Sequence, residues 1–266
     1  MVRTVLLGAG NVATHFGRAM KANGFHVVQV YSRTIGSARA LADILECEAI
    51  NDIGQVLKDA DLYLLSVKDD ALASVIASVC KGREECLFVH TAGSIPMNVF
   101  EGHCKHYGVV YPLQTFSKER SLNFREIPLF VEAINEDALR HLETFAKCLS
   151  ERVFRLSSPL RAKLHLSAVF GCNFVNHCYA LAGEVLKKSG LPFDTLLPLI
   201  DETCRKAHEL SPVEAQTGPA VRWDEGVMRS HCEQLSDQPL WHEIYKTMSL
   251  SIHELDKGRR ADNEMV

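Results

Sequence analysis

A glycine-rich turn between two short apolar runs is the feature that most constrains the fold of this chain. Residues 5–7 are apolar and short enough for a buried parallel strand, and Gly8-Ala9-Gly10 follows at once. Apolar residues then recur at helical spacing as far as Asn23-Gly24, where glycine tolerates the left-handed end of a helix. Residues 27–31 form the next apolar run. The stretch therefore predicts a strand, a tight turn, a helix and a second strand.

The turn matches the fingerprint G-x-G-x-x-G/A, which binds the pyrophosphate of a dinucleotide. Gly8 lets the chain turn sharply, Gly10 leaves room for the phosphates, and Ala13 keeps the helix close to the sheet. Backbone N–H groups at the helix start would hold the phosphates, with help from the helix dipole. A glycine turn in some other α/β protein is the alternative. We expect the binding residues to be Gly8, Ala9, Gly10, Asn11 and Val12.

The residues after the second strand select between the two nicotinamide dinucleotides. An NAD enzyme usually has an acid there, whereas this chain has Ser32-Arg33-Thr34 and no acid before Asp43. Arg33 can pair with a ribose phosphate through two hydrogen bonds, and the hydroxyls of Ser32 and Thr34 can donate to it. The sequence therefore predicts NADP(H) as cofactor. The alternative is that Arg33 is only a solvated surface charge.

Composition limits the classes of function. The chain has 266 residues, of which 47% are hydrophobic and 23% charged, enough for one large domain or two ordinary ones. Its net charge of −4 argues against nucleic acid and against an anionic membrane surface as partners. No apolar stretch approaches the length that spans a bilayer, and an apolar run so close to the start predicts no signal peptide.

The cysteines indicate a reducing environment and no metal site. Nine are scattered along the chain without a C-x-x-C pair, which predicts reduced, intracellular thiols and a cytoplasmic location. His103-Cys104-Lys105-His106 lacks the spacing of a tetrahedral ligand set, so we expect no metal.

Strands and helices alternate as far as residue 156, which predicts an α/β fold with a doubly wound parallel sheet over residues 1–156. In such sheets ligands lie beyond the carboxyl ends of the strands. The residues there that could touch the ribose and nicotinamide are Ser66, Val67, Thr91, Ala92 and Gly93. Ordinary turn chemistry explains these segments equally well.

Residues 157–266 have a different pattern and predict an all-helical second domain. Ser158 as cap and Pro159 in the first turn predict a helix of about thirty residues that ends near Ser189-Gly190. Further helices are expected over residues 193–210, 224–234 and 239–256, with a polar tail from residue 258. A helix this long needs apolar contacts beyond one domain, which predicts a homodimer through this domain.

Two groups in the second half could carry chemistry. At about 100° per residue, one stripe of the long helix holds His165, Asn173 and Asn176. Burying such side chains unpaired would cost roughly 1–3 kcal/mol each, so they should face a polar cleft, a partner helix or water. A hydrated face or a protomer interface remains the alternative. Around Arg222, the stretch 217–224 offers N–H groups and a guanidinium that suit a carboxylate or phosphate, although a plain loop is also possible.

These motifs together resemble a known family. The segments are GAGNVA at 8–13, SRT at 32–34, HTAGS at 90–94, YPLQTF at 111–116, KLHLSAVFGCNF at 163–174 and TGPAVRWD at 217–224. They resemble a Rossmann-like family of NADP oxidoreductases whose helical domain is of unknown function, within the superfamily of pyrroline-5-carboxylate reductases and β-hydroxyacid dehydrogenases. Relatives typically have His-Pro in place of Tyr111-Pro112 and Arg-Gly-Asp in place of Arg222-Trp223-Asp224.

The resemblance implies hydride transfer between NADP(H) and a small carbonyl or imine acid. We expect His165 to act as proton donor or relay, Asn173 to polarise or position the substrate, and Arg222 to hold its anionic end. We expect the cleft between the carboxyl edge of the sheet and the long helix, with Ser94 and Gln114 on one wall and His165 and Asn173 on the other. A non-catalytic NADP(H)-binding regulator is the alternative function.

Overall fold

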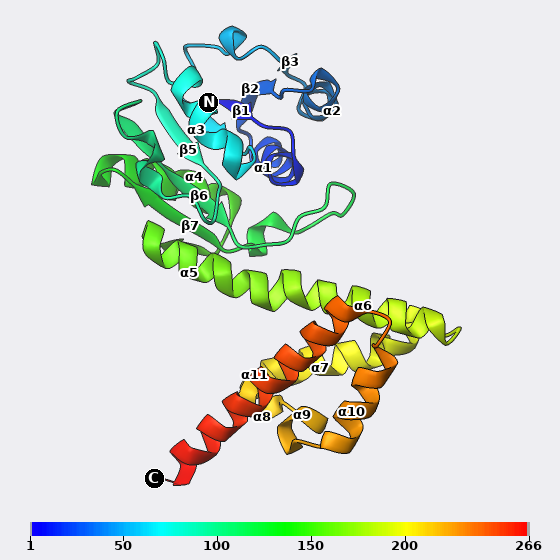
Figure 1. Ribbon diagram of the computed structural model, residues 1–266. Helices are drawn as coiled ribbons and strands as arrows, with labels where there is room; N and C mark the ends of the chain where they lie inside the picture. Colours follow the sequence, from blue (N-terminus) through cyan, green and yellow to red (C-terminus); the bar gives the residue numbers. More distant parts are fainter. Residues whose placement is uncertain (1, 265–266) are drawn as a thin grey trace. The chain divides into compact units, whose positions relative to one another are not determined.

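The chain forms two compact units, Met1–Phe174 and Val175–Val266, and the computed structural model describes residues 2–264. The first unit contains the sheet, and the second is all helical (Figure 1). The division lies within the long helical stretch, whereas the last strand ends at Arg155. The predicted domain boundary between residues 156 and 157 stays a prediction. No helix in residues 2–264 has both the length and the apolar character needed to cross a membrane.

The sheet has eight strands in the order β3-β2-β1-β4-β5-β6-β7-β8. The strands are β1 Arg3–Leu7, β2 His26–Tyr31, β3 Glu48–Ile50, β4 Leu62–Leu65, β5 Leu87–His90, β6 His106–Pro112, β7 Leu129–Ala133 and β8 Val153–Arg155. All neighbours are parallel except β6 and β7, which no long helix connects. The predicted doubly wound sheet is therefore confirmed, with one antiparallel step that the pattern did not predict.

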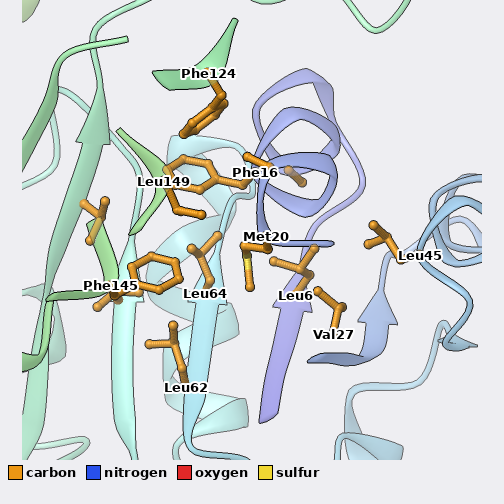
Figure 2. Close-up of a cluster of buried hydrophobic side chains, with 14 of the residues drawn as sticks. Leu6, Phe16, Met20, Val27, Leu45, Leu62, Leu64, Phe124, Phe145 and Leu149 are labelled. Atoms are coloured by element: carbon orange, nitrogen blue, oxygen red, sulfur yellow. The ribbon is translucent and has the colours of Figure 1, made fainter. Parts of the chain in front are cut away.

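Helices cover both faces of the sheet. The elements are α1 Asn11–Ala22, α2 Ile35–Leu45, α3 Asp69–Val79 and α4 Glu136–Leu149, with short 3-10 turns η1 Ile53–Gln55, η2 Met97–Phe100 and η3 Phe124–Glu126. The helices α1, α2 and α4 share one apolar cluster with the sheet, and α3 packs in a second cluster on the other face. Figure 2 shows the first cluster, in which Leu6 and Leu64 meet Phe16, Met20 and Phe145. Burial of each such side chain contributes about 1.5–3 kcal/mol.

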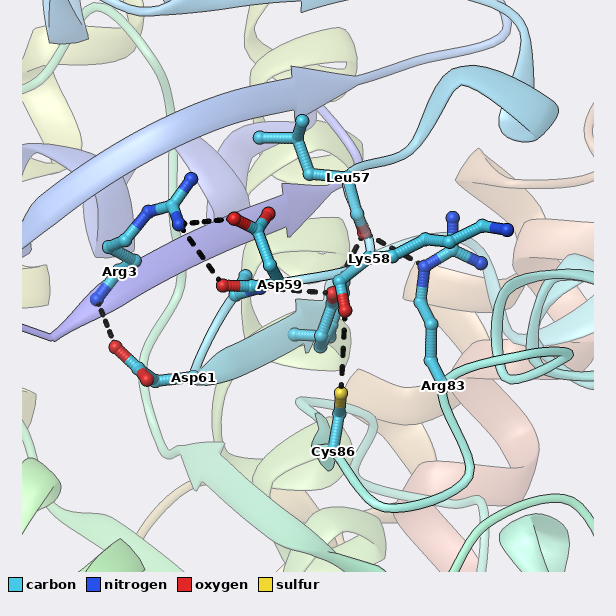
Figure 3. A network of polar contacts seen from close by, with 9 residues as sticks. Arg3, Leu57, Lys58, Asp59, Asp61, Arg83 and Cys86 are labelled. Carbon is cyan, nitrogen blue, oxygen red and sulfur yellow. Dashed lines mark hydrogen bonds and ion pairs between the residues drawn. The ribbon is translucent and has the colours of Figure 1, made fainter.

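A polar network links the segments at the amino ends of β1 and β4 (Figure 3). The buried Arg83 donates from Nε to the carbonyl of Leu57 at 2.8 Å. Arg3 pairs with Asp59 at 2.6 Å, and its backbone N–H donates to Asp61 at 2.7 Å. The predicted ligand site is at the opposite, carboxyl end of these strands.

The long helical stretch consists of α5 Ser158–Ala168, a π-helical turn η4 Val169–Phe174 and α6 Val175–Lys188. The predicted length is confirmed, but the cap is Ser157 rather than Ser158, which is the first helical residue. The assumption of a uniform α-helix was also wrong, because a π turn has i→i+5 hydrogen bonds. Side chains on opposite sides of η4 therefore do not follow the 100° spacing that defined the polar stripe.

The remaining helices are η5 Phe193–Leu196, α7 Leu197–Glu209, α8 Pro212–Ala215, α9 Pro219–Arg222, α10 Glu225–Gln234 and α11 Pro239–Glu264. The predicted polar tail from residue 258 was wrong, because α11 continues through it. Arg259 and Arg260 each pair with Asp256 at 2.7 Å, at i+3 and i+4 spacing, and these pairs support the extra helical turns.

Candidate functional site

The glycine turn after β1 has the shape that a dinucleotide phosphate needs. Gly8 has φ 123°, and a Cβ there would lie 2.1 Å from the carbonyl oxygen of Ser66, so only glycine fits. A Cβ at Gly10 would meet no atom of the described chain within 4 Å, which leaves space for a ligand. No side chain caps α1 in this part of the structure, so the first N–H groups of the helix can bind an anion.

A cavity of about 320 Å³ adjoins this turn. Its lining includes Gly8, Ala9, Gly10, Ser32, Arg33, Ser66 and Val67 from the predicted set, together with Ser37, Lys68 and Lys118. The structure thus brings the phosphate-binding turn together with Ser32 and Arg33, the residues predicted to select NADP(H). The side chain of Asn11 donates to the carbonyl of Phe116 at 2.8 Å, which leaves the backbone N–H of Asn11 as its group for a ligand. Thr34 is exposed and does not line the cavity.

At the end of β5, Gly93 meets the last turn of α5. His165 lies against Gly93, because a Cβ built at Gly93 would be 2.5 Å from His165 Nδ1 and 3.0 Å from Tyr111 Cε2. The Tyr111 hydroxyl lies 3.0 Å from His165 Nδ1, within hydrogen-bond distance. Three segments that are distant in sequence therefore converge at the carboxyl ends of β5 and β6. Glycine at position 93 makes room for the Tyr111–His165 pair.

The environment of Tyr111 keeps its hydroxyl protonated. The side chain is 7% exposed, and burial raises the pKa of the phenol, an effect that the nearby Arg161 guanidinium partly offsets. A neutral phenol can donate a hydrogen bond to a ring nitrogen or accept one from it. If the hydroxyl donates to Nδ1, the proton of a neutral His165 ring is on Nε2. The pair can therefore hold and transfer a proton.

A buried ion pair fixes α5 on the sheet. Arg161, 1% exposed, pairs with Glu132 of β7 at 2.6 Å and donates to the carbonyl of Ile95 at 2.6 Å. The backbone N–H of Ser158 donates to the same carboxylate at 2.8 Å, which places an acid at the helix start. Arg161 and His165 are four residues apart and share a helix face. The ion pair thus holds His165 in position.

His90 at the end of β5 is a buried, neutral side chain. Its Nδ1 accepts a hydrogen bond from the backbone N–H of Ala92 at 3.1 Å, and its ring stacks on Phe100. Burial and the charge of Arg161 lower the pKa of His90 to about 3. The ring therefore stays neutral at physiological pH and fixes the turn that leads to Gly93.

Other predicted residues have different surroundings. Ser94 donates to Asp69, and Gln114 accepts from the N–H of Thr115 at 2.8 Å, so these side chains bond locally instead of to His165. Asn173 is exposed on the π turn, and Arg222 is exposed on α9 of the second unit. Among the predicted catalytic residues, His165 is the one for which the structure gives a contact with the end of the sheet, at Gly93 and Tyr111.

Sequence reasoning missed Tyr111, Arg161 and Glu132. Tyr111 ends an apolar strand at a position where relatives typically have histidine, and no pattern in the sequence gives it a role in proton transfer. An acid inside a predicted strand and an arginine four residues before His165 were the available signals for the buried pair. Neither signal shows that Glu132 pairs with Arg161, because the two residues are far apart in sequence.

Comparison with known proteins identifies the family. Residues 3–92 match a family model described as "NADP oxidoreductase coenzyme F420-dependent", and residues 127–252 match a domain of unknown function, DUF2520. A solved "putative NADP oxidoreductase" from Bacteroides fragilis is 54% identical, with a TM-score of 0.92 over 95% of this chain and 98% of that one. The chain belongs to this NADP oxidoreductase family. The predicted cofactor NADP(H) and the predicted family resemblance are confirmed.

More distant structures share the fold of this NADP oxidoreductase. A reductive aminase from Aspergillus terreus, in complex with NADPH and ethyl-5-oxohexanoate, is 14% identical over 98% of this chain and 94% of that one, with a TM-score of 0.67. A pyrroline-5-carboxylate reductase from Coxiella burnetii is 17% identical over 96% and 97% of the two chains, with a TM-score of 0.57.

A curated relative matches over a much shorter length. The glutamyl-tRNA reductase of Marinomonas sp. (strain MWYL1) is 37% identical over 83 residues, which are 30% of this chain and 18% of that protein. The matched part thus spans less than a fifth of that relative.

Proposed function

We propose that this NADP oxidoreductase reduces a small, anionic carbonyl or imine compound, with Tyr111 and His165 as its proton-transfer pair. The contact of this pair with Gly93 supports the proposal most strongly. Gly93 belongs to the segment predicted to lie near the nicotinamide, so the proton source would be next to the carbon that is reduced. The fold relation to a reductive aminase and a pyrroline-5-carboxylate reductase agrees with this class of substrate.

NADPH, when bound, supplies the hydride to the carbonyl or imine carbon. The substrate oxygen or nitrogen then needs one proton, which the Tyr111 hydroxyl or the His165 ring donates. The second member of the pair replaces that proton, and solvent restores the pair after the product leaves. Arg161 and Glu132 keep His165 in place during this exchange.

Asn173 and Arg222 remain proposed substrate-binding residues. Arg222 is exposed, and no carboxylate of the described chain lies within 4.0 Å of it, so its guanidinium is free to hold an anion. Asn173 is exposed on the π turn, a kind of turn that occurs often at functional sites. The acid group of the substrate would pair with Arg222, and the Asn173 amide would orient the reacting group.

We also propose a homodimer through the helical unit. Within residues 175–261, only Ala220, Ser249 and Asp256 are buried, which is too little for a stable helical core. Phe174 and Val185 are 50% and 43% exposed. A second copy of the chain would cover such apolar surface. Light scattering at micromolar concentration should give twice the mass of one chain, and the mass of a single chain would contradict the dimer.

The thiols support a reducing compartment, so we propose a cytoplasmic location. All nine cysteines are free. Burial raises the pKa of Cys47 to about 11, and the neighbouring Cys104 thiol raises the pKa of Cys80. A raised pKa keeps these two thiols protonated, and the protonated form resists oxidation because the thiolate is the reactive form.

The activity can be tested by following NADPH oxidation at 340 nm across a panel of keto acids, cyclic imines and keto acid–amine mixtures. We expect one subclass to give saturable oxidation that the variant His165→Gln loses by about a hundredfold or more. NADPH titration of the same variant controls for binding. Tight NADPH binding without substrate-dependent oxidation across the whole panel would instead favour a non-catalytic regulator.

A further inference from the structure

The cavity beside the glycine turn carries more positive charge than the fingerprint explains. Arg33, Lys68 and Lys118 all line it, and no aspartate or glutamate does. None of the three has a carboxylate oxygen within 4.0 Å in the part of the chain that the structure describes. Three unpaired cations around one cavity repel one another, so the arrangement favours an anionic occupant.

Lys118 comes from a different part of the chain than the other two cations. It lies in residues 113–123, an irregular segment between β6 and η3, which we name the strap. Arg33 follows β2 and Lys68 follows β4, at the positions where ligand-binding loops of such sheets usually lie. Lys118 is half-buried although no acid pairs with it in the described residues.

The strap is attached to α1 by three hydrogen bonds, in which side chains of the helix donate to successive carbonyl groups of the strap. Asn11 donates to Phe116 at 2.8 Å, His15 to Ser117 at 2.9 Å, and Arg18 to Lys118 at 3.1 Å. The donors at positions 11, 15 and 18 lie on one face of the helix. Because a carbonyl oxygen only accepts, the Nε2 atom of the buried His15 carries a proton.

We propose that the strap positions Lys118 to bind a phosphate of NADP(H), and that Lys118 is therefore a cofactor-binding residue outside the sequence fingerprint. The same helix then serves the cofactor twice, through the N–H groups of its first turn and through the side chains that hold the strap. The proposal concerns binding of the cofactor alone, so it does not depend on the proposed reductase activity.

Fluorescence titration of NADPH and NADH without substrate tests the proposal. Lys118→Met should weaken NADPH binding about tenfold, whereas Lys118→Arg should stay within about threefold of the wild type. The matched control is Lys81→Met, an exposed lysine outside the cavity. An equal loss for both dinucleotides would assign the contact to the pyrophosphate, and a loss for NADPH alone would assign it to the ribose phosphate. Binding of both within twofold of wild type by Lys118→Met, with unchanged thermal unfolding, would overturn the proposal.

The role of the strap needs a double-mutant cycle. Arg18→Met removes the hydrogen bond to the Lys118 carbonyl and should weaken NADPH binding about threefold in the wild-type background. In the Lys118→Met background the same change should have no effect, because the lysine that it positions is gone. An equal loss in both backgrounds would show that Arg18 acts independently and would contradict the positioning role.

Discussion

The phosphate end and the proton-transfer end of this site are built in different ways. The phosphate end uses the backbone of one continuous stretch, in which Gly8 and Gly10 are needed because they have no side chain. The proton-transfer end uses side chains of Tyr111 and His165, which are 54 positions apart and meet only in the folded chain. A local backbone motif can be recognised in sequence, whereas a pair of distant side chains depends on the packing of the elements that carry them.

The largest predicted effect concerns the support of the proton-transfer end. Arg161→Met should lower the free energy of unfolding by about 3–5 kcal/mol, because it leaves the Glu132 carboxylate, which is 17% exposed, without its positively charged partner. The exposed pair Arg125–Glu151 is the control, and Arg125→Met should cost about 0–1 kcal/mol. Urea unfolding measures both values. Equal losses for the two variants would mean that the buried pair does not anchor α5.

The next largest effect separates binding from folding at the phosphate end. Gly10→Ala puts a methyl group into the space that the phosphates need and should weaken NADPH binding about a hundredfold, or about 2.7 kcal/mol. Folding should be nearly unaffected, because no described atom lies within 4 Å of the added carbon. Gly258→Ala on α11 is the control and should leave NADPH binding unchanged. Unchanged NADPH affinity of Gly10→Ala would place the phosphates elsewhere.

A pH effect should distinguish the buried His90 from exposed histidines. The unfolded state takes up a proton on His90 below about pH 6.5, whereas the folded state does so only near its pKa of about 3. The unfolded state therefore binds more protons in this window, and stability falls as the pH is lowered through it. Between pH 7.5 and pH 5.0, His90 should account for a fall of about 2 kcal/mol in the free energy of unfolding.

Two variants isolate this contribution in urea unfolding at the two pH values. His90→Asn keeps a hydrogen-bond acceptor near Ala92. On acidification, its free energy of unfolding should fall by about 2 kcal/mol less than that of the wild type. His26→Asn, at an exposed site, should behave like the wild type. The same pH dependence in all three proteins would mean that His90 is not the titrating group.

A smaller effect at the phosphate end tests cofactor choice. Arg33→Ala should weaken NADPH binding about tenfold and leave NADH binding nearly unchanged, because only NADPH has the ribose phosphate. Arg39→Ala, an exposed arginine of α2 outside the cavity, is the matched control. If NADH binding fell as much as NADPH binding, Arg33 would not be the residue that selects between the two cofactors.

The sequence predicts the phosphate end and most of the fold for a physical reason. Residues 3–34 contain the strand, turn, helix and strand of the fingerprint, and local periodicity defines each element. Local patterns do not show that a helix will have a π turn at residues 169–174 or that α11 will extend past Gly258 on its Asp256 ion pairs. They also do not show that Tyr111 meets His165, because strand order and the buried Arg161–Glu132 pair determine that contact.

One comparison tests the central claim, that cofactor binding and proton transfer belong to separate ends of the site. The NADPH dissociation constant and the single-turnover rate of NADPH oxidation should be measured for His165→Gln, Tyr111→Phe and Arg33→Ala, with the best substrate of the panel. We predict that His165→Gln lowers the rate about a hundredfold or more and Tyr111→Phe about tenfold, each with a dissociation constant within twofold of wild type. Arg33→Ala should instead weaken NADPH binding about tenfold and leave the single-turnover rate close to that of the wild type. A wild-type rate for His165→Gln, or a loss of NADPH affinity as large as its loss of rate, would contradict the account.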